Sequence, residues 1–133
     1  MARLTIFFLL ISIISSGQIQ FNYSEIIPKN ITVKHLFDTS NYIDNSLRLS
    51  IVDYLTIKQL DPTKYFVDST INIQGDTMYI ALWNFAGLKR LKEIEKQNKK
   101  NETQMTLTGN PGYCGTIQYD KKTKQIIGFY LWQ

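Results

Sequence analysis

Two short runs of alternating apolar and polar residues, joined by a glycine-containing turn, constrain the fold of this chain most strongly. Residues 67–73 read VDSTINI, residues 78–83 read MYIALW, and Gln74, Gly75 and Asp76 lie between them. Successive side chains of a strand point to opposite faces of its sheet, so a period of two is typical of strands. Two such runs around a glycine turn predict a β-hairpin.

The segment before the hairpin predicts a helix over residues 41–60. Asn41 is a residue type that caps helices, and Asp44 follows near the positive end of the helix. Asp61 precedes Pro62, and we expect the helix to end there because the residue before a proline avoids helical geometry. Four apolar residues recur at every fourth position and therefore share one helical face: Ile43, Leu47, Ile51 and Leu55.

The remaining sequence predicts a second helix and three more strands. Residues 85–87 (FAG) break the second hairpin strand, and Leu88, Leu91 and Ile94 then recur every three residues among charged neighbours. This narrow apolar stripe is typical of a surface helix, which we expect to end in the polar residues 97–101. Strands are expected at residues 104–108, 114–119 and 125–132, with turns at 109–112 and 120–124.

These elements predict an α+β fold. The simplest layered arrangement is one antiparallel sheet of four to five strands, with one main helix packed on it and a second, shorter surface helix. In the last strand, alternation places Ile127, Phe129 and Leu131 on one face. The opposite face receives Ile126, Tyr130 and Trp132. Because both faces are apolar, this strand is either central or has a helix on one side and a partner or ligand on the other.

The N-terminus predicts export. Arg3 precedes an almost wholly apolar run over residues 4–14, and the small residues Ser15, Ser16 and Gly17 follow. This order is typical of a secretory signal peptide, with cleavage after Gly17. The alternative, a membrane anchor, needs about 20 apolar residues. We therefore expect a signal peptide at 1–17 and a single α+β domain at 18–133, without a transmembrane segment and located in the periplasm or secreted.

The whole chain has a formal net charge of +4. Its positive charge is concentrated in the second half. Most of the excess lies in residues 89–100 and in Lys121, Lys122 and Lys124. Such a patch favours an acidic partner or a membrane surface, and a solvated helix face and hairpin turn are the alternative. Nucleic acid is an unsuitable partner because no nucleic-acid-binding module is visible. The candidate partner-binding residues are Lys89, Arg90, Lys92 and Lys96.

Cys114 and His35, the only cysteine and the only histidine, are the candidates for chemistry. A lone thiol in an oxidising compartment is buried, paired between chains, or reactive. A Cys114–His35 pair would form a minimal nucleophilic site, but no hydrolase signature surrounds the cysteine. The acidic residues show no pair spaced for glycoside hydrolysis and no calcium loop. We therefore expect no catalytic residues, no metal and no cofactor, with Cys114 as a possible reactive thiol.

The aromatic residues of the strands suggest a binding surface. Four of them would form a platform for a sugar, lipid or peptide if they shared a sheet face: Tyr79, Trp83, Tyr130 and Trp132. The alternative is that these rings pack beneath a helix.

The C-terminal residues carry a resemblance. Gly109–Gly115, Thr116–Tyr119, Asp120–Lys124 and Gln125–Trp132 form a glycine-rich turn, a strand, a hairpin turn and a last strand. This order resembles small exported bacterial proteins with a cystatin-like or NTF2-like cone fold, and especially NTF2-fold immunity-type proteins. The resemblance implies binding, often of a toxin, rather than catalysis.

We therefore expect a non-enzymatic binding protein of the cell envelope whose partner is another protein. One alternative is a binder of small ligands, such as a sugar or lipid, that uses the sheet aromatics. A cysteine-dependent hydrolase is the other alternative.

Overall fold

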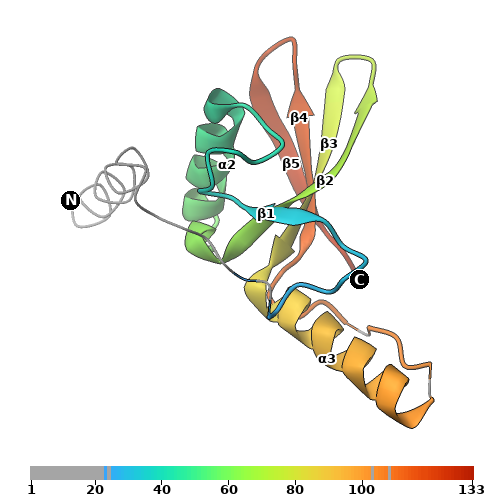
Figure 1. Cartoon of the computed structure of the whole chain (residues 1–133). Coiled ribbons are helices and arrows are strands. Elements are labelled where there is room, and N and C mark those ends of the chain that lie inside the picture. Colours follow the sequence, from blue (N-terminus) through green and yellow to red (C-terminus); the bar gives the residue numbers. More distant parts are fainter. Residues whose placement is uncertain (1–22, 24, 103, 108) are drawn as a thin grey trace.

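The computed structural model describes residues 23, 25–102, 104–107 and 109–133, so the predicted signal peptide lies outside the described residues. The strands form one antiparallel sheet in the order β1-β2-β3-β4-β5 (Figure 1). Its strands are β1 (Val33–His35), β2 (Tyr65–Gln74), β3 (Thr77–Asn84), β4 (Gly115–Asp120) and β5 (Gln125–Leu131). The helices are α2 (Asn45–Ile57), α3 (Phe85–Asn101) and a short 3-10 turn, η1 (Pro62–Lys64).

The predicted fold class, α+β with an antiparallel sheet of four to five strands, is confirmed. The hairpin is also present: β2 and β3 pair from Tyr65 opposite Asn84 to Gln74 opposite Thr77. Gly75 has a positive φ of 60°, which glycine adopts at little cost and which this tight turn requires. Within the part that the structure describes, no helix is both long enough and apolar enough to cross a bilayer.

α2 lies across one face of the sheet (Figure 1) and buries the apolar face that the sequence predicts. Its cap is Asp44 rather than Asn41, because the Asp44 carboxylate accepts the backbone N–H of Leu47 at 2.7 Å. The Asn41 side chain instead donates to the Leu36 carbonyl in the preceding turn. The helix ends before Pro62 is reached, where Gln59 adopts a φ of 63°.

The main core fills the space between α2 and the sheet. Aromatic and aliphatic side chains from every strand except β1 meet the helix there, and burial of this apolar surface is the principal stabilising term. The fully buried members on the strands are Tyr65, Val67, Ile80, Leu82 and Ile117, and those on the helix are Ile51, Val52 and Leu55.

α3 begins immediately after β3. The Asn84 side chain accepts the backbone N–H of Ala86 at 3.1 Å and so caps the helix at its first turn. Residues 85–87, which the sequence predicts as a break, are therefore the first turn of α3. With 17 residues against 13 in α2, α3 is also longer than expected. It extends away from the sheet (Figure 1).

The strand predicted at residues 104–108 is wrong over its described part, because residues 104–107 form no strand. This segment instead lies along α3. The Asn98 side chain donates to the Met105 carbonyl at 2.9 Å and accepts the Met105 N–H at 2.8 Å. A side-chain amide thus occupies the backbone groups that a neighbouring strand would otherwise pair.

β5 is an edge strand, so the first of the two predicted alternatives, a central position, is wrong. α2 packs against one face of β5, as the second alternative expects, and a partner or ligand on the other face stays a prediction. The face assigned to Ile126 is also wrong. Gln118 pairs with Gly128 but Tyr119 pairs with Ile126, so Ile127 is an extra residue in β5. This bulge reverses the alternation at one point, and Ile126 consequently packs in the α2 core together with Phe129.

Candidate functional site

The four aromatic residues singled out in the sequence lie on one face of the sheet, opposite α2. Three of them are adjacent in their strands to a core residue on the other face, as Trp83 is to Leu82 and Tyr130 is to Phe129. Trp132 follows β5 and joins this face through its contacts with Thr116 and Trp83. The structure therefore meets the geometric condition for a shared aromatic face. Whether this face binds a ligand remains a prediction.

Trp83 and Trp132 form the closest pair of this face. Their ring centroids are 4.8 Å apart in an edge-to-face arrangement. The Trp83 indole N–H donates to Asp68 at 3.1 Å, and the Trp132 indole N–H donates to the Thr116 hydroxyl at 2.9 Å. Both rings are thus fixed by hydrogen bonds as well as by packing. Such fixed rings lose little conformational entropy when another molecule packs against them.

Tyr130 is the most exposed member of the aromatic face. Its side chain is 58% exposed, whereas Trp83 packs against the small cluster of Val33, Phe66 and Leu88. The Tyr130 ring lies over Gly128, because a Cβ on Gly128 would come within 3.3 Å of it. The Tyr130 ring is therefore open to solvent, while Trp83 and Trp132 are partly covered.

The unpaired edge of β5 adjoins this face. β4 is the only strand beside β5 in the part of the chain that the structure describes. β5 reads QIIGFYL and contains neither a charged residue nor a proline, the features that proteins commonly use to protect an edge strand. Leu131 is 46% exposed, next to Tyr130. The bulge at Ile127 leaves the stretch from Gly128 to Trp132 as the regular part of the edge.

Hydrogen-bond direction identifies which backbone groups face outward. The backbone N–H of Trp132 donates to the Cys114 carbonyl at 3.0 Å, toward β4. Because these directions alternate along an antiparallel strand, the N–H groups of Leu131 and Phe129 point to the open side. Two backbone donors are therefore available at the edge beside Tyr130.

Three exposed lysines precede this edge: Lys121, Lys122 and Lys124. They belong to the turn between β4 and β5, where Asp120 accepts the Lys122 N–H at 2.9 Å. This hydrogen bond is the main reason that the pKa of Asp120 is lowered. One end of the open edge is therefore positively charged, while the edge itself is uncharged.

The predicted basic patch lies along α3. Lys89 and Lys96 are exposed, and Arg90 pairs with Glu93 at 3.6 Å. Lys92 is half-buried and donates to the Ile27 carbonyl at 3.3 Å. Two of the four residues thus have partners within the chain, and binding of an acidic partner by the patch remains a prediction.

Cys114 is a packed core residue with 2% exposure. Its Sγ accepts the backbone N–H of Asn84 at 3.2 Å and donates to the Pro111 carbonyl at 3.7 Å. Burial raises the pKa of the thiol. These surroundings favour the protonated form, which is the unreactive one.

His35 is buried at the start of the fold rather than placed in a cleft. Its Nδ1 accepts the backbone N–H of Phe37 at 3.1 Å, and its Nε2 lies 2.7 Å from the Thr63 carbonyl. Because Nδ1 is an acceptor, Nε2 carries the proton and donates to Thr63. The ring also stacks on Tyr23, with centroids 5.4 Å apart. The imidazole therefore joins β1 to the turn before β2.

This environment predicts a stability that depends on pH. Burial lowers the pKa of His35 from 6.5, although Thr63, Asp38 and Asp61 oppose the shift. The unfolded chain then binds the proton first, so stability is complete above the ordinary value of 6.5 and decreases as the pH falls toward the lowered pKa. We expect the melting temperature of the wild type to fall over this window. His35→Gln cannot titrate, so its melting temperature should change less, and parallel profiles for the two proteins would contradict this role.

Two structural features, the open edge of β5 and a separate pocket beside α3, were not predicted from the sequence. The open edge depends on which strands become neighbours, and only the lack of charge in residues 125–132 hinted at it. A pocket beside α3 has no sequence signal, because it needs residues 104–107 to fold back on the helix. Among the described residues, no cluster of His, Cys, Asp or Glu is arranged to hold a metal ion.

In comparisons with known proteins, no protein-family model, curated protein or solved structure matches the chain.

Proposed function

We propose that this chain is an exported, non-enzymatic protein that binds a segment of another protein by adding it as a strand to β5. The observation that carries the proposal is the uncharged, unpaired edge from Gly128 to Trp132, with outward backbone donors at Phe129 and Leu131. Strand addition uses such edges: backbone hydrogen bonds supply affinity and alternate side chains supply specificity.

The neighbouring side chains define the chemistry of the added segment. On the aromatic face, Tyr130 and Trp132 offer apolar contact to one set of alternate side chains of the partner. On the other face, Leu131 offers apolar contact to the intervening set. Since every strand pair in the sheet is antiparallel, the segment would end beside Lys124. It is therefore an apolar strand with acidic residues at its C-terminal end.

Export is supported by the order of residues in 1–17, and the resemblance to NTF2-fold immunity-type proteins agrees with a protein partner. A small ligand on the aromatic face is the second candidate. It is favoured by the fixed Trp83–Trp132 pair alone. An added strand would contact the same rings, so the rings do not distinguish the two functions. The outward backbone N–H groups do, because an added strand needs them and a small ligand on the aromatic face does not.

The test is selection of binders from a random eight-residue peptide library displayed on phage. The bait is the protein purified after expression of the full coding sequence, and its mass reports whether it begins at Gln18, as export predicts. Selected peptides should be apolar with acidic C-terminal ends. Leu131→Pro removes an outward N–H but no hydrogen bond to β4. It should therefore weaken the affinity for the selected peptides at least about tenfold.

The matched control is Leu131→Ala, which loses the side chain but keeps the N–H. It should lose only the apolar contact of the side chain and therefore weaken binding clearly less than Leu131→Pro, and circular dichroism should show both variants folded. Equal binding by wild type and Leu131→Pro would contradict strand addition. A dimer that Leu131→Pro dissociates would also contradict the proposal, because a second copy would then occupy the edge.

A further inference from the structure

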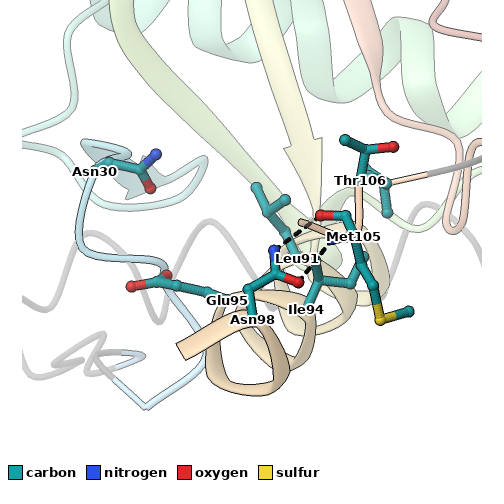
Figure 2. Close-up of a pocket in the computed structure, with 8 residues that line it drawn as sticks. Asn30, Leu91, Ile94, Glu95, Asn98, Met105 and Thr106 are labelled. Atoms are coloured by element: carbon teal, nitrogen blue, oxygen red, sulfur yellow. Dashed lines mark hydrogen bonds between the residues drawn. The ribbon is translucent and has the colours of Figure 1, made fainter. Parts of the chain in front are cut away.

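A pocket lies between α3 and residues 104–107, away from the β5 edge. Its volume is about 300 Å³, which is at the lower end for small-molecule sites. Figure 2 shows its lining, which comes from three parts of the chain. Its apolar walls are Leu91, Ile94, Met105 and Leu107, and its polar members are Asn30, Glu95, Asn98 and Thr106.

The pocket wall is held in place by specific bonds. Asn98 on α3 makes the two hydrogen bonds to the Met105 backbone described above, drawn as dashed lines in Figure 2. Ile94, which also lines the pocket, is buried with 3% exposure. The two hydrogen bonds thus hold the segment that contains Met105 against α3, and this contact defines the pocket.

Glu95 gives the pocket its polarity. Among the described residues, its Oε2 is buried and has no hydrogen-bond partner. In Figure 2 its side chain extends away from Met105, toward Asn30. A buried carboxylate oxygen without a partner costs free energy, which a donor from a bound molecule would offset.

We propose that this pocket binds a small molecule with a cationic ammonium head and a short apolar body. The ammonium donates to Glu95 Oε2, and the body contacts Leu91, Ile94 and Met105. Both an ammonium and a hydroxyl can donate to the carboxylate, but only the ammonium adds Coulomb attraction between opposite charges, so a charged donor is favoured. A carboxylate head is disfavoured because it would face the like charge of Glu95.

The probe is hexylamine, which is an ammonium ion at neutral pH. Binding is followed by NMR through the methyl signals of Leu91, Ile94 and Met105 in the purified protein. Those methyls should shift on titration, and hexanol should bind at least about tenfold more weakly. Glu95→Gln keeps the size of the side chain and should weaken hexylamine by at least about tenfold.

The matched control is Glu93→Gln, which removes an exposed carboxylate from the same helix. It should leave hexylamine binding unchanged. Absence of methyl shifts, equal affinity for hexanol, or equal losses in the two variants would each overturn the proposal. Because strand addition is tested through Leu131, failure here is distinguishable from failure of the proposed function.

Discussion

Tyr65→Ala should destabilise the folded protein by about 3–5 kcal/mol, the usual cost of truncating a fully buried aromatic residue. The Tyr65 ring is 0% exposed and packs edge-to-face on Phe129 of β5, with centroids 6.3 Å apart. Its hydroxyl donates to the Tyr113 carbonyl at 2.9 Å. The residue therefore joins the core, the edge strand and the loop before β4. Chemical denaturation followed by circular dichroism measures the loss.

Tyr65→Phe separates the two contributions of this residue. It keeps the ring and removes only the hydrogen bond, so it should cost about 1 kcal/mol. Burial raises the pKa of Tyr65 to about 12, so the hydroxyl stays a donor at all ordinary pH values. Equal losses for Phe and Ala would mean that the hydrogen bond rather than packing dominates, contrary to this interpretation.

Gly87→Ala should destabilise the protein by about 1–3 kcal/mol, a typical cost of overpacking. Alanine in place of glycine inside a helix normally stabilises by about 1 kcal/mol, so the expected sign is reversed here. A Cβ on Gly87 would overlap Cys114 Sγ and lie 3.1 Å from the Pro111 carbonyl oxygen. Denaturation of the variant measures the sign directly.

A double-mutant cycle with Cys114→Ala tests the cause. Removing Sγ opens space, so Gly87→Ala should cost less in that background than in the wild type. An unchanged cost would mean that the thiol is not the obstacle. The same cycle tests the structural role of Cys114, because a packed thiol predicts coupling and an exposed thiol predicts none.

Periodicity was sufficient to predict much of the fold. The alternation around Gly75 predicts the hairpin, and the four-residue spacing of Leu47, Ile51 and Leu55 predicts the buried face of α2. These signals succeed because each reflects one face of one element meeting one core.

Where tertiary contacts override local pattern, prediction from the sequence failed. The bulge at Ile127 reversed the face of Ile126, and a pattern of period two cannot show an inserted residue. The predicted strand at 104–108 lost its backbone partners to Asn98, a side chain on α3. Gly87 was interpreted as a breaker, although its small size is what allows α3 to pass Cys114.

The candidate site was predictable only in part. Alternation groups Tyr79 with Trp83 and Tyr130 with Trp132, but only the register of β3, β4 and β5 brings the two pairs to one face of the sheet. The edge position of β5 required the order of strands in the sheet, and the pocket at Glu95 required the path of residues 104–107. Neither follows from local residue spacing.

Amide hydrogen exchange read by NMR is the most direct test of strand addition at β5. The spectrum of the protein alone is compared with that of the protein saturated with one of the selected peptides. The peptide is chosen from the phage selection in which the same purified protein was the bait. The outward N–H groups of Phe129 and Leu131 should become protected on binding, while the inward N–H of Trp132 should change little. Protection of neither Phe129 nor Leu131, with the peptide demonstrably bound, would place the peptide elsewhere and contradict the proposed function.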